Sequence, residues 1–331
     1  MTPRRIIAAA LAFAAAVTLT ASPQAAPYRA PRTADGQPDL QGFWTTLSAT
    51  SLQRPAGAPL TFATRAQEQA YESNLMAQIA RGEASGLGQG AAEWHPAYGM
   101  ARLDGKLRTS WLVSPADGRL PYRPEALKRF QALMAAAAES PANPEDRPPT
   151  DRCLLAGFAS ATPPMMNPAV AGGKQIVQTA TEVAILSEMN HDLRIIRLAG
   201  SLGREKGRKA RQAAPAHLPP SVRVWLGDSV GHWEGETLVV ETTNFHDQET
   251  FRGPVYMISA AARVTERFTR TARDEIRYAF EVDDPATYTA PWRGEMPLHP
   301  DKGPIFEFAC HEGNYSMPLM LQIARAAEKG R

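Results

Sequence analysis

The feature that most constrains the fold is a change in hydrophobic period after residue 152. From residue 174 onward, short segments alternate polar and apolar residues, and turn residues separate them. The clearest segment is 275–282. Its apolar face consists of Ile276, Tyr278, Phe280 and Val282. Because a period of two places successive side chains on opposite faces of a strand, this region predicts a sheet with one buried face.

The predicted strands follow one another with short connections, which favours an antiparallel meander. They cover residues 174–187, 193–198, 222–226, 237–243, 263–270, 275–282, 292–298 and 305–309. Such a sheet removes its unpaired edges by closing on itself. We therefore predict a mainly β protein with a helical N-terminal part and an antiparallel up-and-down, lipocalin-like β-barrel. A barrel of about eight strands is just wide enough to hold one small ligand.

The N-terminus has the layout of a secretory signal peptide. Arg4 and Arg5 precede an uncharged apolar run over residues 6–19, and small residues follow. The alternatives are a retained membrane anchor and an apolar core helix. We predict that residues 1–26 are removed and that the mature protein is periplasmic or secreted, with no membrane span.

The remaining chain divides at a Pro-rich connector. Residues 27–152 are predicted to form an extended and helical segment that packs on the barrel, and residues 153–331 the barrel with a C-terminal helix. Helices are predicted over residues 62–80, 124–139 and 318–328. The 28 Pro and 24 Gly concentrate in the extended part and in turns, which argues against a helical bundle.

Charge excludes one class of function. The chain has 36 Lys and Arg against 34 Asp and Glu, a net charge of +2. Proteins that bind nucleic acids depend on a strong surplus of positive charge at their phosphate contacts. We therefore expect a small-molecule partner and no nucleic acid.

The chain has two cysteines, Cys153 and Cys310. In an oxidising compartment two cysteines usually pair, so we predict a disulfide between them. The alternative is a reactive thiol at Cys310 beside His311, but such a thiol is readily oxidised outside the cytoplasm.

Several motifs of known chemistry fail on their context. Residues 227–231 match the serine-hydrolase elbow around Ser229, but a hairpin follows where that motif requires a helix. His311 and Glu312 begin like a zinc-protease helix, but Tyr315 occupies the place of the second His. No glycine loop for phosphate is present in the sequence. We expect neither a metal site nor a cofactor.

Two polar clusters remain, at residues 188–194 and 307–315, each at the end of a predicted strand. An imidazole titrates near neutral pH, and neighbouring carboxylates tune it. The acid/base candidates are His191, His311, Glu312 and Tyr315. By alternation Arg194 points into the barrel, where a guanidinium holds a carboxylate through two hydrogen bonds. Further candidates for substrate binding are Asp192, Trp233, Asn244 and Asn314. The alternative is that these polar residues serve turns and local hydrogen bonds.

Longer motifs add a resemblance. The segments PDLQGFW, GDSVGHWEGETLVVETTNF, VDDPATYTAPW and FEFACHEGNY resemble those of a large family of exported bacterial proteins, over most of the mature chain. The family is associated with cofactor-free decarboxylation of lignin-derived aromatic acids, in particular phenylcoumaran-type carboxylates. The resemblance implies an activity of this kind here.

The leading hypothesis is therefore a cofactor-independent lyase that decarboxylates a bulky aromatic acid in the periplasm. Arg194 would hold the substrate carboxylate, and protonation of an ether oxygen beta to it would drive loss of carbon dioxide. The alternatives are a carrier or sensor of a hydrophobic small molecule and an interaction protein of the cell envelope. A carrier predicts an almost wholly apolar cavity, whereas a lyase requires ionisable residues inside the barrel.

Overall fold

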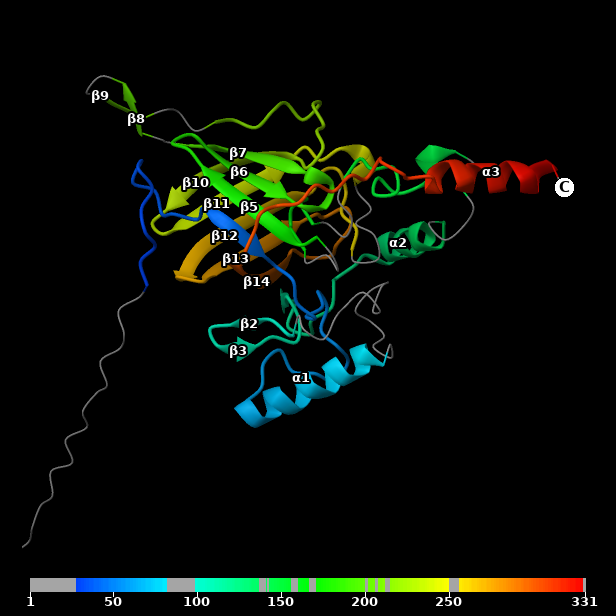
Figure 1. The fold of residues 1–331 in the computed structure, drawn as a ribbon, viewed down its shortest axis with the longest axis horizontal. Helices are drawn as coiled ribbons and strands as arrows, with labels where there is room; N and C mark the ends of the chain where they lie inside the picture. Colours follow the sequence, from blue (N-terminus) through cyan, green and yellow to red (C-terminus); the bar gives the residue numbers. More distant parts are fainter. Residues whose placement is uncertain are drawn as a thin grey trace, which may run out of the picture.

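The computed structural model describes residues 28–81, 99–136, 141, 143–155, 160–166, 171–199, 202–205, 208–211, 215–249 and 256–329. The predicted signal peptide, residues 1–26, lies outside these ranges. The described part is mainly β, and nine of its strands close into a barrel (Figure 1).

The barrel wall is continuous because its first and last strands in spatial order pair with each other. In that order the strands are β1 (Gly42–Thr45), β5 (Gly173–Gln178), β6 (Glu182–Ser187), β7 (Leu193–Leu198), β10 (Asp228–Glu234), β11 (Thr237–Thr243), β12 (Arg263–Ala272), β13 (Glu275–Asp283) and β14 (Trp292–Pro300). A tenth strand, β4 (Leu112–Ser114), pairs along β14 from outside the closed ring.

One pair departs from the predicted antiparallel meander. β7 and β10 run parallel, with Ser229 opposite Ile196, while the other pairs of the closed wall are antiparallel. Parallel neighbours need a connection long enough to return the chain to its starting end. Residues 199–227, which join these two strands, provide that length. The closed barrel predicted from sequence is thus present with mixed strand directions.

The N-terminal segment contributes to the barrel wall itself. β1 comes from residues well before 153 and lies between β5 and β14. Two segments predicted as strands are not strands in the structure. In residues 222–226 the only β pairing is an isolated bridge from Val224 to Phe245, and residues 305–309 have no strand assignment.

In the described ranges, three α-helices lie outside the barrel (Figure 1). They are α1 (Arg65–Ala80), α2 (Pro124–Ala136) and α3 (Ser316–Lys329). α1 packs on a small hairpin formed by β2 (Arg102–Leu103) and β3 (Lys106–Leu107), and not on the barrel wall. A second hairpin consists of β8 (Leu202–Glu205) and β9 (Arg208–Arg211). None of the helices in the described ranges has the length and apolarity needed to cross a membrane.

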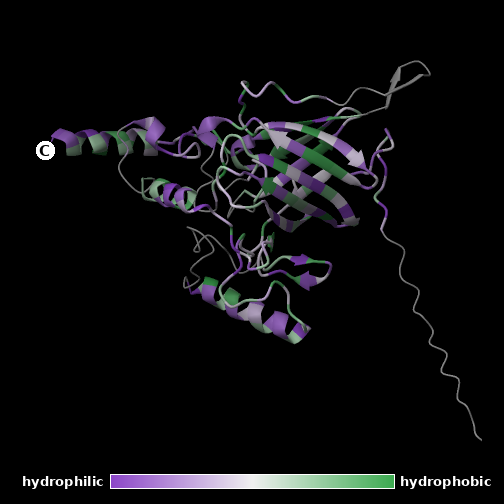
Figure 2. Ribbon diagram, turned by 180° about the vertical axis from the view of Figure 1, so that it is seen from behind, coloured by the Kyte–Doolittle hydropathy of each residue, from purple (hydrophilic) through white to green (hydrophobic). Residues whose placement is uncertain are grey.

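Alternation along the strands produces the core. Figure 2 shows hydrophilic and hydrophobic residues in turn along the barrel wall. The inward side chains form one apolar cluster that includes the fully buried Trp292, Tyr278 and Phe268. Residues 160–166 are buried along their whole length, and Met165 and Met166 belong to the same cluster. This segment therefore packs against the inward side chains of the barrel.

Candidate functional site

A buried ion pair crosses the barrel interior. Arg194 on β7 and Glu266 on β12 have side chains that are 1% and 0% exposed. Arg194 donates from Nη1 to Glu266 Oε1 at 3.0 Å and from Nη2 to Glu266 Oε2. The guanidinium thus meets the carboxylate through two parallel hydrogen bonds, which is the strongest geometry for such a pair. Arg194 points inward, as alternation predicted, but its paired N–H groups are engaged by Glu266.

Three hydroxyl groups complete this interior network. Arg194 Nε donates to Ser229 Oγ at 3.0 Å, and Nη2 donates to Thr242 Oγ1 at 2.9 Å. The Tyr278 hydroxyl donates to Glu266 Oε1 at 2.6 Å. Burial, followed by the negative charge of Glu266, raises the pKa of Tyr278 well above its ordinary value. Tyr278 therefore remains a protonated donor at neutral pH.

A lysine is buried in the same barrel. Lys174 lies at the second position of β5, is 0% exposed, and faces Trp44 and Ser187 on the two neighbouring strands. Its ammonium donates to Ser160 Oγ at 3.5 Å, and Ser160 Oγ lies 3.0 Å from Ser187 Oγ. An ammonium has three N–H donors, and within the described chain this is the one acceptor that Lys174 reaches.

The burial of Lys174 has an electrostatic consequence. Removal from water disfavours a charged amine. Burial lowers the pKa of Lys174 to about 8, and the negative charge of Glu188 opposes the shift. A group with a pKa near the working pH is well suited to donate and accept protons. Lys174 with the hydroxyls of Ser160 and Ser187 therefore has the chemistry of an acid/base site.

The sequence contained a signal for both charged interior residues. Lys174 shares the parity of Ile176 along its strand, and Glu266 shares that of Val264 and Phe268. A charged residue at an apolar register position is costly to bury unless it is paired or functional. The alternation predicts a strand at both places, and a charged residue at an inward position is the exception to it that marks each of these two side chains.

The first predicted cluster lies at the surface. The exposed His191 ring bridges two backbone groups of the C-terminal segment. Its Nδ1 accepts from the Phe308 N–H at 3.4 Å, so Nε2 carries the hydrogen that it shares with Phe306 O at 2.9 Å. This contact brings the 188–194 and 307–315 clusters together outside the barrel, where His191 anchors the segment that leads to α3.

The second predicted cluster lies beside the disulfide. Cys153 and Cys310 are bonded, with their Cα atoms 5.7 Å apart, which confirms the predicted pairing. Asn314 donates from Nδ2 to Cys153 Sγ at 3.3 Å. The acid/base candidates of this cluster, His311, Glu312 and Tyr315, are all exposed, and Tyr315 is 72% exposed. The structure therefore places these three side chains in solvent and not in the barrel interior.

Removal of the disulfide is expected to destabilise the protein. Replacing Cys153 and Cys310 with Ser should lower the free energy of unfolding by about 2–4 kcal/mol, because the bridge restricts the unfolded chain over a long loop. Urea unfolding of the double variant measures the effect. The reduced wild-type protein is the control and should unfold at the same urea concentration as the variant. An unchanged midpoint in both samples would contradict a stabilising bridge.

The other predicted substrate-binding residues are dispersed. Asp192 is buried and accepts at Oδ1 from Asn190 Nδ2 at 3.0 Å. Asn244 donates from Nδ2 to Leu218 O at 2.8 Å, which holds a loop on the outside of the barrel. Trp233 is partly buried and packs against the apolar cluster. The contacts of Asp192, Asn244 and Trp233 therefore stabilise a turn, a loop and the core, respectively.

A polar cluster on the outer wall was missed by the sequence analysis. His217 lies 3.0 Å from Asp228 Oδ2 through Nδ1 and 3.1 Å from Glu241 Oε1 through Nε2. Burial on its own would raise the pKa of Asp228, but hydrogen bonds from the Leu218 N–H, His217 and Arg197 lower it below its ordinary value. The cluster fastens residues 215–222 to the wall, a role that requires no ligand.

Comparison with known protein families, curated proteins and solved structures found no match. In the ranges that the structure covers, no three His, Cys, Asp or Glu side chains gather as ligands for a metal ion. The buried charged groups of the barrel interior are therefore the features on which a functional inference rests.

Proposed function

We propose that this protein is a cofactor-independent lyase that decarboxylates an aromatic carboxylic acid, with Lys174 as the group that supplies the proton. The observation that carries the proposal is the buried Lys174 ammonium, whose one hydrogen-bond acceptor in the described chain is the Ser160 hydroxyl at 3.5 Å. A carrier barrel has no need for a buried amine with unfilled donors. Such donors favour a substrate that brings an anionic or ether oxygen.

The chemistry is balanced with a single proton. Electrons of the bond between the alpha carbon and the carboxylate form the new alkene as carbon dioxide leaves. The bond from the beta carbon to its ether oxygen breaks, and that oxygen takes a proton from the Lys174 ammonium. The Ser160 and Ser187 hydroxyls connect with the amine and can relay its replacement proton. Exclusion of water strengthens these charge interactions.

Arg194 receives a different role from the one expected on sequence grounds. Its guanidinium is filled by Glu266, Ser229 and Thr242, so it orders the interior and does not bind the substrate carboxylate. Because His191 and His311 are exposed, the proposed proton donor moves from the surface turns to Lys174. The proposal also includes a lipocalin-like enclosure of the ligand by the barrel. It further includes residence in the periplasm, and the disulfide supports this location because disulfides persist in oxidising compartments.

A substrate panel tests the proposal. Purified protein is incubated with aromatic carboxylic acids that carry an ether oxygen beta to the carboxylate, including phenylcoumaran-type acids, and products are detected by mass spectrometry. We expect loss of carbon dioxide from at least one ether acid. The matched control acids, in which a methylene replaces the ether oxygen, should remain unchanged because no leaving oxygen is present. Tight binding of the ether acids without product would overturn the lyase proposal in favour of a carrier.

A further inference from the structure

The Lys174 amine has apolar surroundings that exclude water. Its side chain is 0% exposed, and the inward residues beside it on β5 and β6 are Ile176 and Ile185, each 2% exposed. The other lysines whose side chains the structure describes are all exposed: Lys106, Lys128, Lys302 and Lys329. Among the described lysine side chains, Lys174 is therefore the one that is held out of water.

Burial increases the share of this amine that is neutral. Only a neutral amine has the lone pair that attacks a carbonyl carbon. Burial lowers the pKa of Lys174 to about 8, against the opposing effect of the Glu188 charge. At pH 7 about a tenth of the Lys174 amines are then neutral, roughly two hundred times the share of a lysine with its ordinary pKa. Near neutral pH the neutral amine is thus available at Lys174 and scarce at the exposed lysines.

Two hydroxyl groups beside the amine can move the protons that imine formation requires. Ser160 Oγ lies 3.5 Å from Lys174 Nζ and 3.0 Å from Ser187 Oγ, and both serines are 0% exposed. The two hydroxyls carry two hydrogens, and the contact between them uses one. The second hydrogen can therefore be donated to a carbonyl oxygen that enters beside the amine.

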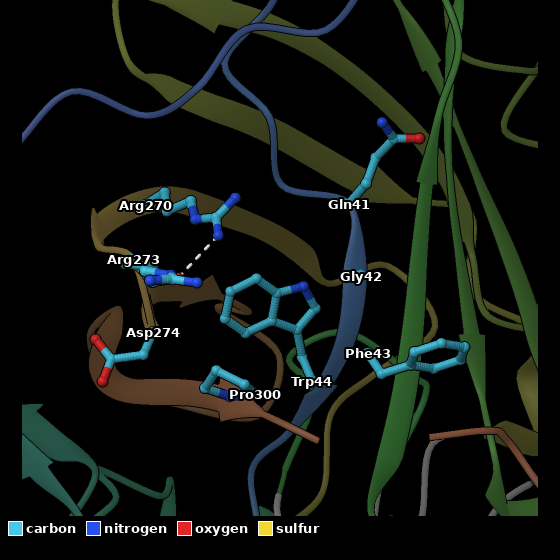
Figure 3. A pocket seen from close by; sticks show the side chains of 8 residues that line it. All are labelled: Gln41, Gly42, Phe43, Trp44, Arg270, Arg273, Asp274 and Pro300. Carbon is cyan, nitrogen blue, oxygen red and sulfur yellow. Dashed lines mark hydrogen bonds between the residues drawn. The ribbon is translucent and has the colours of Figure 1, made fainter. Parts of the chain in front are cut away.

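A pocket near the amine gives a small molecule a way in. It has a volume of about 540 Å³ and lies at the end of the barrel, with Trp44 and Pro300 in its lining (Figure 3). Trp44 is the register partner of Lys174, and its strand β1 lies between β5 and β14. The Trp44 side chain therefore stands between the pocket and the amine. We expect a shift of this one side chain to admit a molecule of a few atoms.

We propose that Lys174 is a nucleophile that forms an imine with a small aliphatic aldehyde. The nitrogen lone pair bonds to the carbonyl carbon, and the π electrons of the carbonyl move to its oxygen, which takes a proton from the Ser160 and Ser187 pair. The nitrogen returns a proton to that pair. The new hydroxyl group then takes a second proton through the same pair and leaves as water, while the nitrogen loses its remaining hydrogen and the C=N bond forms.

The surroundings of the amine select the class of carbonyl compound. Apolar neighbours favour an alkyl chain, and close packing favours an aldehyde, which has one substituent, over a ketone, which has two. The reaction joins one amine and one aldehyde and releases one water, so it needs neither an oxidant nor a reductant. The inference does not depend on the proposed lyase activity, because the aldehyde reacts with the neutral amine and not with the ammonium.

Borohydride trapping of the wild-type protein tests the proposal. The protein is incubated with propanal at pH 7, sodium borohydride reduces the imine to a stable secondary amine, and mass spectrometry quantifies the propylated peptides. We expect the Lys174 peptide to be labelled about tenfold or more above those of Lys106 and Lys302, because neutral amine is abundant only at Lys174. In protein unfolded with guanidinium chloride the preference should disappear, since it depends on burial.

A pair of variants tests the role of the hydroxyls. Ser160→Ala should slow the labelling of Lys174 about tenfold or more at short incubation times, because it interrupts the proton transfer. Ser73→Ala is the matched control, since Ser73 is exposed on α1, and it should leave the rate unchanged. An unchanged rate in Ser160→Ala would overturn the assigned proton path.

The pH dependence and the surface lysines complete the test. The preference for Lys174 should shrink toward about pH 10, where the exposed amines are neutral as well. Labelling of Lys106 and Lys302 without Lys174, or equal labelling of all three in the folded protein at pH 7, would overturn the proposal. Trapping requires no turnover, so a protein that decarboxylates an acid but is not trapped at Lys174 would refute the imine and leave the lyase proposal standing.

Discussion

Replacing Lys174 with Met is expected to lower kcat by about 10²- to 10⁴-fold, the contribution typical of a positioned proton donor. Met keeps most of the side-chain volume and removes the ammonium. Turnover of the acid identified in the substrate panel measures the effect. Lys106→Met is the matched control, because Lys106 is exposed on β3 and outside the barrel; it should retain wild-type kcat. Full activity of Lys174→Met would remove this residue from the mechanism.

The same variant separates a functional lysine from a structural one. Burial of a poorly paired charge costs free energy, so Lys174→Met should unfold at a urea concentration no lower than that of the wild type. Lower stability of the variant would instead indicate that the amine helps to hold the barrel together. Loss of activity with retained stability is the combination expected of a functional group.

The pH dependence of stability has a defined sign. The pKa of Lys174 is lowered to about 8 in the folded protein, below the value in the unfolded chain. Between these two values the unfolded chain binds more protons, so the wild type gains stability as pH rises. The free-energy cost of burying the charged Lys174 ammonium is fully present below about pH 8 and absent above the unfolded pKa. This cost is on the order of 3 kcal/mol. Urea unfolding of the wild type and Lys174→Met is measured below pH 8 and again above the unfolded pKa of lysine. The difference between their free energies of unfolding should be smaller at the higher pH.

Glu266→Gln is expected to destabilise the protein by about 3–5 kcal/mol, because it leaves the buried Arg194 charge without its carboxylate. The side chains involved are 1% and 0% exposed, so water cannot take over the lost interaction. Urea unfolding at neutral pH measures the change. The control is Glu281→Gln on β13, whose carboxylate is 45% exposed and 3.8 Å from Arg293; surface substitutions of this kind usually change stability by less than about 0.5 kcal/mol.

A double variant distinguishes loss of the pair from loss of shape. Changing Arg194 and Glu266 together to Met removes both charges and should recover most of the stability lost in Glu266→Gln. If the double variant is as unstable as the single one, the interior depends on the hydrogen bonds to Ser229, Thr242 and Tyr278 and not on charge balance. A Glu266→Gln protein within about 1 kcal/mol of the wild type would contradict the account of a buried charge pair.

The sequence predicted the barrel because alternation is a strong and local signal. Residues 275–282 lie in β13 and residues 237–243 form β11, and the inward faces predicted there are buried. β1 was missed because its four residues are too short to show a period within a Pro- and Gly-rich stretch. The parallel pair of β7 and β10 was missed because strand direction depends on the path of the long connection, which alternation does not encode.

The candidate site was harder to predict than the fold. His191, His311 and Glu312 are residue types that suit acid/base chemistry. The sequence of a strand-end turn, however, does not show whether its side chains face the barrel interior or solvent. Partners distant in sequence are equally hidden: Arg194 meets Glu266 across 72 positions. Lys174 was visible only as a charged residue at an inward register position, and its Ser160 partner lies in a segment without secondary structure.

The rate of product formation as a function of pH tests most directly whether Lys174 supplies the proton. If its ammonium is the donor, kcat/KM, which reports the groups of the free enzyme, should decline on the alkaline side with an apparent pKa near 8, set by burial of the amine. The same profile measured on Lys174→Met should lack this decline. A decline near 8 that is absent from the variant supports the buried lysine, whereas a flat wild-type profile through pH 8 would contradict it.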